Sequence, residues 1–178
     1  MGHSGWFGIG AYVAALAQKH WLGGQTVLPL LASMAFIAAL STVVGLLMLR
    51  RRGVYFSLLT LAFAALTYTI AFRWTEVTGG EDGLGGLKRG GIATIPLDNG
   101  LAYYAFVSLV ALGVLYVLLR VTRSPFGHVL VAIRENQQRA MFQGYDVDRY
   151  RLAAFVLSAV VTGLSGALYG FLNYLVSA

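Results

Sequence analysis

The 178-residue sequence contains no cysteine, which excludes a disulfide framework, a thiolate metal site and a cysteine nucleophile. Histidine is almost as scarce, and His3, His20 and His128 are too scattered to form a set of metal ligands. Gly-x-Ser-Gly sequences occur at 2–5 and 163–166, but a serine nucleophile needs a base, and no histidine lies in any long apolar run. We therefore expect neither a bound metal nor a catalytic residue, and we do not expect an enzyme.

Charged residues are also few. They make up 11% of the chain, whereas soluble domains usually carry about 25%. Since 58% of the residues are hydrophobic and the mean hydropathy is +0.71, the expected surroundings are a lipid bilayer. The net charge of +6 would suit nucleic acid, but the basic residues lie mainly at the ends of apolar runs, where the positive-inside rule places them. Membrane lipid is thus an expected partner, and nucleic acid is not.

Four apolar runs are long enough to cross the hydrocarbon core, which needs about 20 residues. They are Thr26–Leu49, Gly53–Phe72, Leu101–Leu119 and Leu152–Val176. A fifth run, Gly5–Ala17, is shorter and rich in glycine, which indicates a half-helix, a re-entrant segment or the tail of a longer span. The predicted fold class is all-α: a polytopic transmembrane helical protein with about four full spans, a short N-terminal half-span, and one domain over residues 1–178.

The charges of the links between these spans predict their orientation. Arg50, Arg51 and Arg52 form a triple-arginine turn between the first two full spans. The link 73–100 has three basic against four acidic residues, and the link 120–151 has six arginines against three acidic residues. Because cytoplasmic loops carry the excess of arginine and lysine, the triple-arginine turn and the 120–151 loop are expected in the cytoplasm. The 73–100 link and the C-terminus are expected on the far side.

The link 120–151 contains the only long polar segment with helix signals. Ser124 suits the N-cap, Pro125 the first helical position and Gly144 the position just past the end. The apolar face of this amphipathic helix carries Phe126, Leu130, Ile133, Ala140 and Met141. The polar face carries Arg134, Glu135, Gln138 and Arg139, with Glu135 and Arg139 spaced as a favourable i,i+4 pair. Such a helix is either a docking surface for a partner or a helix that lies in the lipid headgroup layer.

The second full span carries polar side chains that could line a path for a solute, namely Tyr55, Ser57, Thr60, Thr67 and Tyr68. The alternative, which we favour, is that the hydroxyls bond back to their own helix or to neighbouring helices. The middle of each full span lacks charged residues, although proton- and sodium-coupled carriers usually hold a carboxylate there. If the protein moves a solute, the energy is therefore expected from a partner that docks on the 120–151 loop.

Glycine and other small residues are concentrated in two places. In the far-side link, a polar glycine-rich loop begins with Gly79, Gly80, Glu81, Asp82 and Gly83. The loop has no G-x-x-x-x-G-K-[ST] phosphate-binding sequence, so it is either a lid-like loop at the outer mouth of a pathway or an inert connector. In the last span, small residues recur at Ser158, Thr162, Gly166 and Gly170, beside a second row of Ala159, Gly163 and Ala167. This repeat predicts tight packing against another helix.

Four stretches of the sequence resemble the LivM-like permease subunits of branched-chain amino-acid ABC importers. They are GHSGWFGIGAYVAAL (2–16), RRRGVYFSLLTLAFA (50–64), TGGEDGL (78–84) and the long block from SPFGHVL to GALYG (124–170). The last block is the most specific. The resemblance implies a permease of the bacterial inner membrane that moves branched-chain or related amino acids by alternating access. Permeases for urea and short-chain amides are close relatives and remain the alternative. A secondary carrier, a channel and a non-transporting structural membrane subunit are less favoured alternatives.

The resemblance also implies partners. In the family, a cytoplasmic loop between two late spans contacts the ATPase subunit through an E…A…G signature. In a divergent form, that signature falls on Glu135, Asn136, Ala140 and Gly144, and Arg134 and Arg139 beside them complete the expected coupling surface. The partner binds and hydrolyses ATP, so this chain is expected to bind no cofactor itself. A second permease subunit and a periplasmic substrate-binding protein would complete the assembly. The chain is shorter than family members commonly are, which suggests truncation at both ends.

Overall fold

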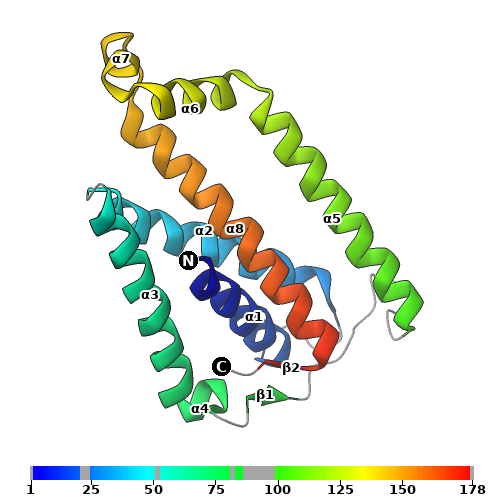
Figure 1. The fold of residues 1–178 in the computed structure, drawn as a ribbon. Coiled ribbons are helices and arrows are strands. Elements are labelled where there is room, and N and C mark those ends of the chain that lie inside the picture. Colours follow the sequence, from blue (N-terminus) through cyan, green and yellow to red (C-terminus); the bar gives the residue numbers. More distant parts are fainter. Residues whose placement is uncertain (1, 21–24, 51–52, 81–82, 86–98, 177–178) are drawn as a thin grey trace.

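The computed structural model of the protein describes residues 2–20, 25–50, 53–80, 83–85 and 99–176 (Figure 1). The helices are α1 (His3–His20), α2 (Val27–Met48), α3 (Val54–Arg73), α4 (Thr75–Thr78), α5 (Gly100–Thr122), α6 (Pro125–Glu135), α7 (Gln137–Phe142) and α8 (Val147–Asn173). Two short strands, β1 (Leu84–Gly85) and β2 (Leu175–Val176), complete the described elements. The predicted all-α class is confirmed.

Four helices, α2, α3, α5 and α8, are long and apolar enough to cross a membrane, as the sequence predicts. The first three begin and end close to the predicted runs, but α8 begins at Val147 rather than at Leu152. The reason is a helix cap, because the side chain of Asp146 accepts a hydrogen bond from the backbone N–H of Arg149 at 3.2 Å. The first turn of α8 is therefore polar, and a search for apolar runs passes over it.

Helix α1 is longer than the apolar segment predicted for it. It runs unbroken from His3 to His20, which at 1.5 Å per residue is about 27 Å. Figure 1 shows α1 in the middle of the molecule, and it contacts α2, α3 and α8. Its first residue lies part way along α8, since His3 Nε2 and Ser158 Oγ are 2.8 Å apart. Gly10 then lies against Gly163, so α1 and α8 run in the same direction.

Small residues allow α1, α2 and α8 to approach one another closely. Gly10 of α1 lies so near the backbone of Gly163 that a Cβ on Gly10 would collide with it. A Cβ on Gly166 would collide with the carbonyl oxygen of Phe7, and one on Gly163 would collide with the side chain of Ile37. In a bilayer, van der Waals contacts between closely spaced backbones are a main source of helix association. These three helices form the best-packed part of the fold.

Helices α3 and α5 touch the rest of the molecule much less. Tyr103 is the only buried residue among those described in α5, and Ala71 is the only one in α3. The hydroxyl of Tyr103 donates a hydrogen bond of 2.6 Å to the carbonyl oxygen of Leu168 in α8. Figure 1 shows α5 along one edge of the molecule, next to α8 but standing apart from it. Both helices therefore present long apolar faces to their surroundings.

The end of the bundle opposite α6 and α7 is held by a small sheet and a one-turn helix. Strands β1 and β2 pair antiparallel, with Leu84 opposite Val176, and both side chains are buried against α1. Just before β1, the hydroxyl of Thr78 lies 2.5 Å from the carbonyl oxygen of Ala71 and 2.8 Å from that of Trp74. The start of the far-side link and the segment after α8 are thus both attached to the central helix.

Candidate coupling surface and transmembrane cavities

The prediction of a single amphipathic helix over 125–143 is wrong, because the segment forms two helices. Helix α6 ends at Glu135, α7 begins at Gln137, and Asn136 between them is extended, with φ −152° and ψ 100°. The side chain of Asn136 accepts a hydrogen bond from the backbone N–H of Arg139 at 3.0 Å and so caps α7. Glu135 and Arg139 consequently belong to different helices, and the predicted i,i+4 spacing does not apply to them.

A small apolar cluster packs α6 and α7 against the start of α8. The ring of Phe126 stacks on that of Tyr150 with centroids 5.4 Å apart, and Arg151 donates a hydrogen bond to Gln137 at 2.9 Å. The cluster contains Val129, Ile133, Ala140 and Val147, all buried. Sequence reasoning placed Ile133 and Ala140 on the apolar face but missed the two valines. This packing makes α6, α7 and the first turns of α8 one connected unit.

The outer side of this unit carries the residues that resemble the coupling signature. Arg134, Glu135, Asn136, Arg139 and Gly144 are exposed, while Ala140 is buried beneath them. Gly144 has φ +88° and ends α7 in the left-handed conformation that favours glycine. We call this group of six residues the α6–α7 surface. Figure 1 shows that α6 and α7 lie at one end of the molecule, beyond the long helices.

Phe142, the last residue of α7, is an exposed feature that sequence reasoning missed. Its side chain is 90% exposed, and the adjacent Met141, predicted to be on the apolar face, is 54% exposed. The break at Asn136 rotates the end of the segment away from the apolar cluster, which explains why Met141 is not buried. A large apolar side chain in a polar last turn was the available sequence signal.

A cavity of about 750 Å³ lies between α1, α3 and α8. We call it the His3 cavity, and it is defined by His3, Trp6, Ser57, Thr60, Phe155 and Ser158. Ser57 and Thr60 are two of the five residues predicted for a solute path. His3, which the sequence offered only as a poor candidate for a catalytic base, contacts Ser158 across the cavity wall. That contact joins residues 155 positions apart, so no local sequence pattern indicates it.

The other predicted path residues lie elsewhere. Thr67 and Tyr68 line a second cavity of about 600 Å³ between α1, α2 and α3, whereas Tyr55 lies on the outer face of α3 with 74% of its surface exposed. The hydroxyls of Thr60 and Thr67 donate to the carbonyl oxygens of Ser57 and Phe63, both at 2.9 Å. These are the bonds within one helix that the alternative interpretation of the sequence expects. The five residues therefore do not form one continuous polar stripe.

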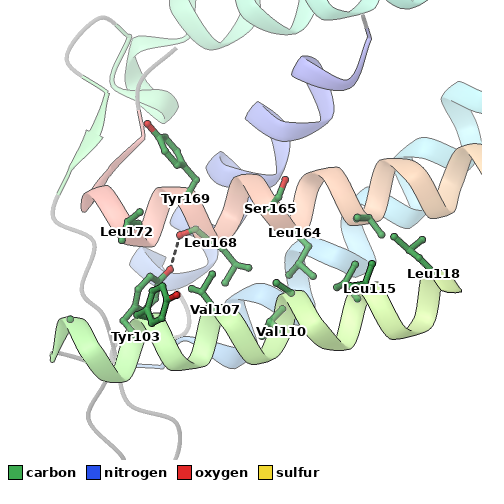
Figure 2. A pocket seen from close by; sticks show the side chains of 15 residues that line it. Tyr103, Val107, Val110, Leu115, Leu118, Leu164, Ser165, Leu168, Tyr169 and Leu172 are labelled. Carbon is green, nitrogen blue, oxygen red and sulfur yellow. Dashed lines mark hydrogen bonds between the residues drawn. The ribbon is translucent and has the colours of Figure 1, made fainter. Parts of the chain in front are cut away.

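A third cavity, of about 570 Å³, is an apolar groove between α5 and α8 (Figure 2). Leucines and valines such as Val107, Val110, Leu115 and Leu164 line it, and the hydrogen bond from Tyr103 to Leu168 lies toward the end nearest the start of α5. The hydroxyls of Tyr103 and Ser165 in this lining both donate to backbone carbonyl oxygens already. Tyr103 donates to Leu168, and Ser165 donates to Thr162 within α8 at 2.6 Å.

The predicted small-residue row divides between two environments. Gly166 and Gly170 are buried against α1. Ser158 instead faces the His3 cavity, and the hydroxyl of Thr162 donates to the carbonyl oxygen of Ser158 at 2.8 Å. The residues that pack on the neighbouring helices beside these glycines come from the second row, namely Ala159, Gly163 and Ala167.

In the far-side loop, Gly79, Gly80 and Gly83 have φ of +78°, +59° and +69°, which favours glycine at each position. Glu81 and Asp82 lie outside the described residues. Across the described parts of the chain, no three His, Asp or Glu side chains gather closely enough to hold a metal ion.

Comparison with known proteins places this fold in a family. The family described as branched-chain amino acid transport system permease component matches residues 1–177. The chain is 32% identical to the high-affinity branched-chain amino acid transport system permease protein LivM of Escherichia coli K12, over 95% of this chain and 45% of that protein. LivM of Salmonella typhimurium LT2 is 30% identical over the same shares. This chain therefore spans less than half the length of both relatives.

A third relative matches a shorter part. It is the probable branched-chain amino acid transport permease protein LivH of Methanocaldococcus jannaschii, which is 38% identical over 41% of this chain and 22% of its own length. No solved structure matches the chain significantly. Since the family match covers nearly every residue and the four apolar helices have the length of membrane spans, the chain is a multi-pass membrane protein that belongs to the branched-chain amino acid transport system permease family.

Proposed function

We propose that this chain acts in a permease that moves branched-chain or related amino acids across the bacterial inner membrane by alternating access. The names of its relatives favour these substrates over urea or short-chain amides. In this proposal, ATPase subunits bind and hydrolyse ATP, so the chain itself needs no cofactor. A second permease subunit and a periplasmic substrate-binding protein are the remaining partners.

The observation that carries this proposal is the way the α6–α7 surface is joined to the transmembrane core. Val129, Ile133 and Ala140 pack on Val147, the first residue of α8. Helix α8 in turn packs along α1 and α2. A force applied to α7 by an ATPase subunit would therefore reach the three best-packed helices through direct contacts, as coupling between distant sites requires. A helix that only rested in the headgroup layer would not need this connection.

The test reverses the charge of one exposed residue on the α6–α7 surface. In the permease assembled with its ATPase and second permease subunits, Glu135→Arg should reduce leucine uptake into proteoliposomes to background. The reason is that it places a cation where the surface presents a carboxylate to the partner. Membrane insertion should be unchanged, because Glu135 is exposed.

Asp148→Arg is the matched control, because it reverses another exposed carboxylate at the same end of the molecule but outside the α6–α7 surface. Its uptake should stay near the wild-type rate. Normal uptake by Glu135→Arg would refute the docking role. Assembly of the wild-type complex without uptake of any amino acid would refute the proposed substrate class.

A further inference from the structure

The His3 cavity combines two kinds of surface that a polar solute with an apolar side chain requires. One wall is aromatic, since the ring of Trp6 lies 4.9 Å from that of Phe63 and 6.0 Å from that of Phe155. Phe56 extends this wall, with its ring 6.4 Å from that of Phe155. Aromatic walls of this kind bind apolar groups in ligand pockets. At about 750 Å³, the cavity is within the size range of small-molecule sites.

The other part of the cavity is polar. His3 Nε2 and Ser158 Oγ lie 2.8 Å apart, and the hydroxyls of Ser57 and Thr60 belong to the same lining. The Thr60 hydroxyl gives its proton to the carbonyl oxygen of Ser57, which leaves its oxygen lone pairs able to accept from an ammonium group. The His3–Ser158 pair keeps one donor for a carboxylate: the Ser158 hydroxyl when the imidazole donates to Oγ, or the second ring nitrogen of His3 when the hydroxyl donates to Nε2. The cavity thus has both acceptors and donors beside its aromatic wall.

The charges that line the cavity limit which solutes it can hold. Among the described residues of the lining, none is aspartate, glutamate, lysine or arginine. An ion with a net charge would lose its hydration there without gaining a counter-charge, which is costly between membrane helices. A zwitterion has no net charge, and its two ionic groups can be satisfied by neutral donors and acceptors.

We propose that the His3 cavity binds the transported solute, and that this solute is an amino acid with an uncharged, apolar side chain. This inference rests on the proposed transport function. The side chain of the solute lies against Trp6, Phe63 and Phe155, its carboxylate accepts from the remaining donor of the His3–Ser158 pair, and its ammonium group donates to Thr60. The groove between α5 and α8 in Figure 2 lacks such a set, because its lining is dominated by leucine and valine.

Two pairs of variants test the polar contacts in the complete transporter. Thr60→Val and Ser158→Ala remove hydroxyls that face the cavity, and each should weaken leucine binding about tenfold, the usual effect of losing a hydrogen bond to a charged group. Thr69→Val is the matched control for Thr60→Val, because the Thr69 hydroxyl makes the same bond of 2.9 Å to its own helix but lies outside the cavity lining. Ser165→Ala is the matched control for Ser158→Ala, because the Ser165 hydroxyl donates to Thr162 within α8 and lies outside the cavity lining. Both controls should bind leucine like the wild type.

Binding is measured with radiolabelled leucine on the complex in lipid nanodiscs, without the substrate-binding protein, so that the affinity belongs to the membrane part. Excess lysine or glutamate should not displace the label, whereas valine and isoleucine should. A diazirine analogue of leucine, photoactivated in the wild-type complex, should modify peptides within 2–6, 56–63 and 154–159. This labelling needs no variant and so remains decisive if a substituted protein fails to fold.

The possible outcomes distinguish failure of the His3 cavity assignment from failure of the proposed transport function. If the wild-type complex binds and transports leucine but the cavity variants bind it like their controls, the site assignment is overturned and the transport proposal stands. Labelling confined to the α5–α8 groove, or displacement of leucine by lysine, has the same meaning. If the wild-type complex neither binds nor transports any amino acid, both proposals fail.

Discussion

Gly166 of α8 lies where the backbones of α1 and α8 meet, and the absence of a side chain there allows the contact. Alanine at this position would drive its Cβ into the carbonyl oxygen of Phe7, which is backbone and cannot rotate away. Gly166→Ala should therefore cost about 1–3 kcal/mol and lower the Tm in detergent by roughly 2–12 °C. Tryptophan fluorescence during heating would measure the change.

Gly113→Ala in α5 is the control for this substitution. Nothing described lies within 4 Å of the position that its Cβ would take. The Tm of this variant should not fall, because alanine favours helix more than glycine does. An equal fall in both variants would mean that the contact between α1 and α8 is not the cause.

Tyr103 is the one buried residue described in α5, and its hydroxyl is a specific attachment of that helix to α8. Tyr103→Phe keeps the ring but removes the donor to Leu168, so unfolding should become easier by about 1 kcal/mol. Tyr104→Phe removes a hydroxyl that is 72% exposed together with its ring, and it should have no measurable effect. The two variants are compared by thermal unfolding in the same detergent, and indistinguishable curves would contradict the attachment.

Single residues were the least predictable part of the molecule. The four-residue spacing of Gly166 and Gly170 indicated a packing face, and both are buried against α1. The same spacing placed Ser158 on that face, but Ser158 faces a cavity, because the angle at which helices cross decides which members of a small-residue row are covered. The spacing of small residues along one helix does not specify the angle at which that helix crosses its neighbours.

At the scale of elements, the break between α6 and α7 depends on one side chain. Asn136→Ala removes the acceptor for the N–H of Arg139 and favours continuation of α6, which would rotate the α6–α7 surface. We expect ATP hydrolysis by the assembled transporter to become uncoupled from uptake, while the amount of protein in the membrane stays the same. Uptake per ATP hydrolysed in proteoliposomes is the measurement.

Asn136→Asp provides the rescue, because aspartate caps helices as well as asparagine does. This variant should couple hydrolysis to uptake like the wild type. Equal coupling in the alanine and aspartate variants would show that the break is not needed for function.

The elements themselves were largely predictable, and for a clear reason. Spanning helices need about 20 apolar residues, and runs of that length, such as Thr26–Leu49, stand out in the sequence. The break at Asn136 was missed because both halves keep helical spacing and strong helix formers surround it. The pairing of β1 with β2 was missed because two-residue strands have no periodicity and their partners lie far apart in the sequence.

The whole molecule has a predicted orientation that the absence of cysteine makes easy to test. Gln138→Cys in α7 and Asn99→Cys before α5 each introduce one exposed thiol. Because the arginine-rich 120–151 loop should face the cytoplasm, a membrane-impermeant maleimide should label Asn99→Cys in spheroplasts and Gln138→Cys only in inverted vesicles. The opposite pattern would reverse the proposed topology and place the α6–α7 surface out of reach of an ATPase.

The central position of α1 has a consequence for how the protein is made. Helix α1 does not reach the apolarity of the four spans, and its main neighbour is α8. The ribosome completes α1 about 130 residues before it begins α8, which at 5–20 residues per second is a delay of roughly 6–25 s. During this interval the innermost helix must be retained at the membrane without its main neighbour. Helix α8 therefore secures α1 only after a delay, and the packed core of α1, α2 and α8 remains incomplete until α8 has been synthesised.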